Sequence, residues 1–288
     1  MNKTFAEHWY RLFLRAFPPG HRAEYGAEII GTLLNDASRR VPSLRETAGL
    51  LTAGYAARAR AATGGPVPWW ADGAHLGLLM FALAHMAYRI ADHASPGWLA
   101  VSALLVVAFL RGWTLLALPL ALAVALSTGR TMLWGLEATE AKFLGPAYHD
   151  WISLAPYGVL VAGAVVIAIR RPRVLRARSW WWSAIPVTAF VLVHTPGVRE
   201  YGETWQLARA GIEGAVLLAG MWATAVARSP RWALAAAIYV LPGVASAMVN
   251  PPSNTQDLGY WTALAALLLA IAATAWKPQP MAEHHRPR

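Results

Sequence analysis

The 288-residue chain contains no cysteine, which excludes disulfide bonds, a thiol nucleophile and any metal site built from thiolates. Charged residues are also scarce, at 14% of the chain, whereas an ordinary soluble domain has about a quarter. A large soluble protein with many buried helices would need far more polar surface than this. We therefore expect most of the chain to lie in a membrane.

The common motifs of enzyme chemistry are missing as well. The nine histidines show no HExxH spacing, and no glycine-rich phosphate loop follows a convincing strand. No serine lies in a nucleophile-elbow context. His284 and His285 stand in a short, proline-flanked tail, 277–288, which we expect to be disordered and cytoplasmic. We predict no catalytic residue, no metal ion, no cofactor and no enzyme activity.

Hydrophobic residues, in contrast, make up 57% of the chain and gather in separate segments. Several windows of about 18 residues are almost free of charge, which is close to the length that spans a hydrocarbon core of about 30 Å. Most of the 15 tryptophans lie near segment ends, where an apolar ring with a polar N–H favours the headgroup region. The predicted fold is all-α, with a polytopic helical membrane domain over 71–276 and about eight transmembrane helices: 72–92, 97–111, 113–129, 151–170, 180–195, 205–227, 231–249 and 258–276.

The count of eight is open at one point, because the short segments 97–111 and 113–129 nearly abut and could form one re-entrant hairpin. Prolines fall inside four segments, where each removes a backbone donor and should kink its helix. Kinked helices occur in transporters and receptors, and also in inert bundles. The four prolines are Pro119, Pro156, Pro186 and Pro242.

Basic residues set the orientation. With the N-terminus inside, most of the 25 lysines and arginines fall on the inner face, as the positive-inside rule requires. An even number of spans returns the C-terminus to the same side, and the first residues lack a signal-peptide pattern. We predict a multi-pass protein of the inner (cytoplasmic) membrane with both termini cytoplasmic. The net charge of +10 then faces anionic lipid, so the expected partner is the bilayer and no nucleic acid is expected.

Ahead of the first span, residues 1–62 predict a cytoplasmic module of three helices, joined to the membrane by a linker and interface anchor over 63–70. The segments Thr4–Glu7 and Ser43–Glu46 each match a capping box that starts a helix. So few residues bury only a thin core, so the module should pack against the membrane, a second copy or another protein. The predicted apolar faces are Trp9, Phe13 and Phe17 on the first helix, Tyr25, Ile29 and Leu33 on the second (21–38), and Leu44, Ala48, Leu51 and Tyr55 on the third. From these faces we take Phe13, Phe17, Tyr25, Ile29 and Leu33 as the candidate partner-docking residues.

Two stretches of this module carry a family resemblance. The run from Tyr10-Arg11-Leu12 through Phe17-Pro18, followed by His21 to Ile29 (HRAEYGAEI), resembles the permease prefix domain, which is related to HAAS signalling domains found beside PadR-type regulators. His21 stands where the family more often has an aromatic residue, and Ile29 where it more often has methionine. The resemblance covers roughly residues 8–60. It implies a bacterial membrane protein, of an actinobacterial type, whose cytoplasmic helices take part in regulation or protein contacts.

Ionisable residues inside spans are costly, so they are candidates for function. His85 and Arg89 lie four residues apart on the first span, Arg209 and Glu213 lie four apart on the sixth, and His194 ends the fifth. An outward-facing polar cavity between these three spans would bring the set together. Alternatively, Arg209 pairs with Glu213 on its own helix while Arg89 extends to the outer interface, or Arg89 pairs with Glu213 across helices.

Two functions fit these features. The first is an integral membrane regulatory or scaffold protein, whose helical module docks a cytoplasmic protein or a second copy while the membrane domain anchors and senses. The second is a transporter or permease component with an outward-facing polar cavity.

Overall fold

The computed structural model describes residues 3–36, 43–63, 67–91, 94–134, 151–170, 175, 177–195, 202–249, 251 and 254–276. These residues form helices and the turns between them, and no strand occurs among them. The chain divides into two compact units, Met1–Pro66 and Val67–Arg288. The predicted tail 277–288 and part of the predicted linker lie outside the described residues.

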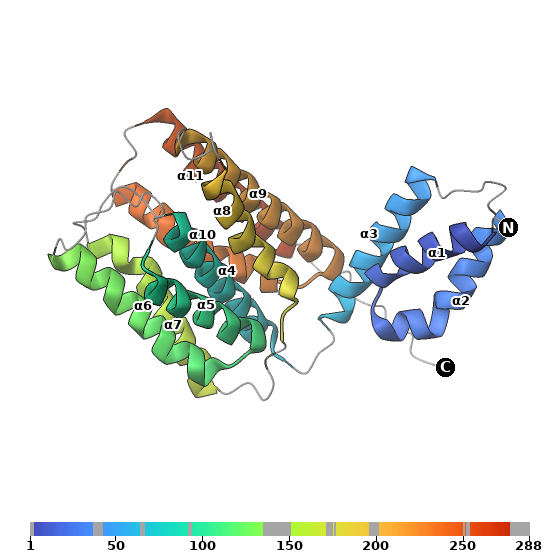
Figure 1. Ribbon diagram of the computed structural model, residues 1–288, viewed down its shortest axis with the longest axis horizontal. Helices are drawn as coiled ribbons and strands as arrows, with labels where there is room; N and C mark the ends of the chain where they lie inside the picture. The colour runs from blue at the N-terminus through green and yellow to red at the C-terminus, as the bar shows by residue number, and fades with distance from the viewer. Residues whose placement is uncertain are drawn as a thin grey trace, which may run out of the picture. The chain divides into compact units, whose positions relative to one another are not determined.

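The first unit contains three α-helices and a short 3-10 helix (Figure 1). Its core lies along one side of α1, where Tyr10 is fully buried and its hydroxyl donates a 3.1 Å hydrogen bond to Oε2 of Glu46 on α3. Burial, together with that hydrogen bond, raises the pKa of the Tyr10 phenol. Arg58 of α3 donates hydrogen bonds to the backbone carbonyls of Arg15 and Ala16 in the 3-10 helix, and these bonds hold α3 against that short helix. The elements are α1 (Lys3–Phe13), η1 (Leu14–Ala16), α2 (Pro19–Asp36) and α3 (Leu44–Ala61).

One of the two predicted helix starts has the predicted geometry. Ser43 accepts a hydrogen bond from the Glu46 backbone N–H, and the Glu46 side chain accepts one from the Ser43 N–H, so this capping box is confirmed. The described part of α1 begins at Lys3, within one residue of the helix start predicted at Thr4, and the side chain of Thr4 lies outside the described residues. Glu7 forms an ion pair with Arg11 one turn later, at 2.6 Å.

The predicted apolar faces are wrong for α1 and α3. In the first helical segment the buried stripe is Ala6 and Tyr10 of α1 with Leu14 of η1, and Phe17 of the predicted face is also buried, while Trp9 is 37% exposed. On α3 the buried residues are small, Gly54, Ala56 and Ala59, whereas Leu44 is 90% exposed. The small residues of α3 allow it to approach Ala16 closely, whereas several large apolar groups of the unit remain exposed. The exposed group also includes Phe5, Leu12, Tyr25 and Tyr55.

The second unit contains an apolar helix at each of the eight predicted segments. Four of these helices are long and apolar enough to cross a membrane, and the other four are shorter. The long ones are α4 (Trp69–Ala91), α9 (Gly202–Ala227, apolar over Leu207–Ala227), α10 (Arg231–Val249) and α11 (Thr255–Trp276). The ones with a shorter apolar stretch are α5 (Pro96–Arg111), α6 (Thr114–Trp134, apolar over Thr114–Arg130), α7 (Ala155–Arg170, after η2 at Trp151–Leu154) and α8 (Ala184–His194, after η3 at Trp180–Ser183).

The central element of this unit is α4, which packs against α5, α7, α8 and α10 (Figure 1). Its closest neighbour is α10, and two glycines explain the approach. A Cβ at Gly73 would lie 2.6 Å from the Arg231 carbonyl oxygen, and one at Gly77 would lie 2.9 Å from the Cβ of Ile238. Any larger residue at these two positions would push α10 away from α4. The core of the unit therefore lies around α4.

Large apolar side chains also cover the outside of this unit, including Leu115, Leu126, Ile169 and Leu269. A water-exposed surface of this kind would be unstable, whereas hydrocarbon favours it. The helices and their surface are therefore compatible with a membrane location.

Two of the four predicted proline kinks are wrong. Pro119 and Pro242 do lie inside α6 and α10. Pro156 and Pro186 lie in the first turns of α7 and α8, where no intrahelical donor is lost and proline is tolerated.

Candidate functional site

The most polar position inside the second unit surrounds Glu213 of α9. Its Oε1 accepts a 3.2 Å hydrogen bond from Nε of Arg209, one turn earlier, and a 2.7 Å bond from the hydroxyl of Tyr239 on α10. Its Oε2 accepts a hydrogen bond from the hydroxyl of Tyr260 on α11. Nη2 of Arg209 donates to the Tyr260 oxygen at 2.6 Å, and its guanidinium lies 4.8 Å from the centre of that ring. Three helices thus meet at one carboxylate.

Local packing explains how Tyr260 reaches Glu213. The next residue, Trp261, places the edge of its indole ring against α10 at Gly243, where an added Cβ would come within 2.2 Å of the ring. Glycine at this position lets α11 lie close to α10, and the Tyr260 ring packs against Trp261 with centroids 5.0 Å apart. The spacing of α10 and α11 therefore depends on a residue that has no side chain.

The charges of the site are nearly enclosed. The side chains of Arg209 and Glu213 are only 13% and 10% exposed. In an apolar surrounding, such a pair is stable only when the remaining lone pairs and protons also find partners, and the two tyrosines supply them. The pair carries no net charge, so the site is polar and electrically neutral.

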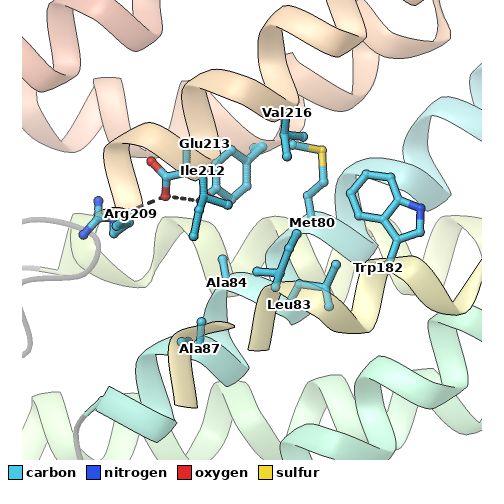
Figure 2. A pocket seen from close by; sticks show the side chains of 12 residues that line it. Met80, Leu83, Ala84, Ala87, Trp182, Arg209, Ile212, Glu213 and Val216 are labelled. Carbon is cyan, nitrogen blue, oxygen red and sulfur yellow. Dashed lines mark hydrogen bonds and ion pairs between the residues drawn. The ribbon is translucent and has the colours of Figure 1, made fainter. Parts of the chain in front are cut away.

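A cavity of about 50 Å³ opens beside this pair (Figure 2). That volume holds a few water molecules or one small group. In the view of Figure 2, the charged pair lies at one end and Trp182 at the other. The lining is otherwise mainly aliphatic, from Met80, Leu83, Ala84 and Ala87 of α4, Ile185 and Ala189 of α8, Ile212 and Val216 of α9, and it includes Tyr239 of α10. The helices of the predicted cavity, spans one, five and six, correspond to α4, α8 and α9, and α10 also contributes.

The structure brings together only two of the five predicted site residues. Arg209 pairs with Glu213 on its own helix, as in the first alternative, so the cross-helix pair of Arg89 with Glu213 is wrong. Arg89 instead lies over the ring of Trp98 on α5, 5.9 Å from its centre. His85 is buried on another side of α4, with Nδ1 3.2 Å from the Tyr157 hydroxyl.

The fifth predicted residue, His194, ends α8 and is exposed. Its Nδ1 lies 2.8 Å from the carbonyl oxygen of Phe190, one turn back along the helix. Neither His85 nor His194 lines the cavity beside Glu213. Among the described residues, no three histidine or carboxylate side chains gather closely enough to hold a metal ion.

Sequence reasoning missed a second polar cluster at the start of α4. The buried carboxylate of Asp72 pairs with Arg178 at 2.5 Å and with Arg231 at 3.3 Å. Arg178 also donates to the Asp72 carbonyl oxygen at 2.9 Å. One turn along α4, Nε2 of His75 lies 2.8 Å from the carbonyl oxygen of Phe109 on α5. The available signal was an aspartate one turn into an apolar segment beside an excess of arginines.

Comparison of the chain with protein-family models, with curated proteins and with solved structures gives no match. The function is therefore inferred from the residues and their geometry.

We predict that Glu213→Gln destabilises the protein by about 3–5 kcal/mol, because Arg209 loses its buried counter-charge. The double variant Arg209→Met, Glu213→Leu should be destabilised less, because it leaves no charge buried without a counter-charge, although the hydroxyls of Tyr239 and Tyr260 lose their partners. Denaturant unfolding of the full chain in detergent measures both, with Asp257→Asn at the more exposed start of α11 as the control. A double variant as unstable as Glu213→Gln would show that the cluster stabilises through more than charge pairing.

Proposed function

We propose that this chain is a multi-pass membrane regulatory or scaffold protein whose N-terminal helical unit docks a cytoplasmic protein. The observation that carries the proposal is a second apolar stripe on α1, on the outside of the unit. Phe5, Trp9 and Phe13 recur every fourth residue and their rings contact in sequence, edge to face from Phe5 to Trp9 and stacked from Trp9 to Phe13, with centroids 6.1 Å and 5.7 Å apart. Leu12 extends the stripe by three residues from Trp9 and is exposed.

This stripe differs from the core of the unit. Ala6, Tyr10 and Leu14 already form the inward face of α1, so the rings of Phe5 and Trp9 do not contribute to it. Contiguous exposed aromatic residues on a small helical unit are typical of a protein interaction site. Of the predicted docking residues, Phe13 belongs to the stripe. Phe17 is buried, Tyr25 is exposed on α2, and Ile29 and Leu33 are half-buried.

The membrane arrangement that we propose has eight crossings with both termini inside. The Asp72 cluster supports it. Because Arg178 pairs with Asp72, Arg178 lies on the same side of the bilayer as the start of α4. After α4 crosses, α5, α6 and α7 bring the chain back if all three cross. Arg231 reaches the same carboxylate after α8 and α9. The long helices alone would put Arg178 on the opposite side from Asp72.

The resemblance of residues 8–60 to the permease prefix domain agrees with a regulatory role and remains part of the proposal. In this arrangement the membrane domain anchors the docking unit at the inner face. The polar site at Glu213 lies toward the outer half and would give the domain a place to sense a small polar ligand.

We predict that a photo-crosslinking amino acid at Leu12, in the full chain in living cells, captures a defined cytoplasmic protein. The same amino acid at the exposed Arg45 of α3 is the control and should capture little. Trp9→Asp should remove most of the Leu12 crosslink while the helix content is unchanged, because Trp9 is outside the core. Crosslinks at Leu12 that reach only lipid, or a Trp9→Asp variant that crosslinks as well as wild type, would contradict docking through this stripe.

A transporter or permease component is the second candidate function. One observation favours it: a cavity that is lined by α4, α8 and α9 reaches a buried charged pair. Transport of a small solute would require that cavity to enlarge and to open toward both sides.

For this second function, we predict that Tyr239→Phe lowers solute uptake into proteoliposomes, because the variant removes the hydroxyl that binds Glu213 Oε1 inside the cavity. Thr262→Ala is the matched control, since Thr262 on α11 bonds only a carbonyl of its own helix in the structure and is exposed. Unchanged uptake by Tyr239→Phe across a broad panel of solutes would exclude transport through this site.

A further inference from the structure

A second, larger hollow lies in the outer surface of the membrane unit. It is a groove of about 320 Å³ between α5 and α8, both of which pack against α4. Met86 and Ile90 of α4 form its floor, and Val107 of α5 and Val187 of α8 stand on its two sides. Among the described residues, its lining is apolar apart from Ser183. The volume lies within the range of ordinary ligand pockets.

The groove faces outward from the helices. Val187 and Phe190, which line it, are 60% and 53% exposed. From Ser183 to Phe190 the groove follows about 10 Å of helix rise. An elongated apolar groove that opens to the surrounding medium in a membrane domain suits a hydrocarbon chain, because nothing in it would bond a polar ligand along most of its length.

One end of the groove carries a cation. Arg111 directly follows the lining residue Leu110, and its guanidinium lies 5.3 Å from the centre of the Trp180 ring, three residues before Ser183. The Arg178 backbone N–H bonds the Leu110 carbonyl at 2.7 Å and so holds the two sides together here. Arg111 is exposed, and no carboxylate within the described part of the chain pairs with it.

We propose that this groove binds an anionic phospholipid of the inner leaflet, with an acyl chain between α5 and α8 and the phosphate at Arg111. The Trp180 ring attracts the guanidinium by a cation–π contact, and guanidinium N–H groups bind a phosphate in the plane of the group. Trp180 and Trp181 are both exposed, as indole side chains at a headgroup boundary commonly are. The proposal needs the membrane location and is independent of the docking and transport functions.

The test is native mass spectrometry of the full chain in detergent, with phosphatidylglycerol and phosphatidylcholine of identical acyl chains. Wild type should retain phosphatidylglycerol preferentially. Arg111→Gln should lower that affinity by about fivefold, the contribution of one basic residue near an anionic surface. Arg170→Gln, another exposed arginine at a helix end on the same predicted side, is the control for charge and should have no effect.

A second pair of variants tests the groove itself. Ala103→Trp fills it and should reduce retention of both lipids, whereas Leu104→Trp, on the neighbouring exposed position of α5, should not. If Ala103→Trp does not fold, the wild type is photolabelled with a diazirine-bearing phosphatidylglycerol. The labelled residues should lie on α5 and α8 around Val107 and Val187, and not at Leu122 of α6. Equal retention of the two lipids, equal loss in the two tryptophan variants, displacement by inorganic phosphate alone, or labels spread evenly over the helices would overturn the proposal.

Discussion

The arrangement of the second unit depends on the double ion pair of Asp72. Its carboxylate lies at the start of the most enclosed helix, where an unpaired charge would be very costly, and two arginines from distant parts of the chain pair with it. Each arginine fixes where its own segment begins: Arg178 ahead of η3 and α8, and Arg231 at the first turn of α10. Gly73, the next residue, lets α10 approach closely enough for that contact. The order of the helices around α4 follows from these contacts.

Several other buried polar groups also take a partner from a different helix, whereas Ser102 and Thr224 bond carbonyls of their own helices. His75 reaches α5, His85 reaches Tyr157 of α7, and Glu213 joins α9 to α10 and α11. In a unit whose core is almost entirely aliphatic, these few hydrogen bonds specify which helices are neighbours, since hydrophobic packing alone is less selective. A cavity opens beside the site at Glu213, and the second candidate function, transport, rests on it.

The positions of the helices could be predicted from sequence because apolar segments and tryptophan boundaries are strong, local signals. Which face of each helix is buried could not be predicted in the same way. On α1, the stripes through Tyr10 and through Trp9 have the same periodicity, and no local pattern decides which of the two is buried. Tyr260 was not identified as a site residue because a tyrosine near a span end ordinarily anchors at the interface. Its role depends on Gly243, a contact between helices that no local pattern reveals.

The central claim is that the short helices cross the membrane together with the long ones. Because the chain has no cysteine, single cysteines report accessibility without background. Ala177, beside Arg178, and Thr255, at the start of α11, are both exposed on the isolated chain. With eight crossings, a membrane-impermeant maleimide labels Thr255→Cys in intact cells and labels Ala177→Cys only after the membrane is permeabilised. If only the four long helices cross, both positions lie outside, and labelling of Ala177→Cys in intact cells would contradict the arrangement.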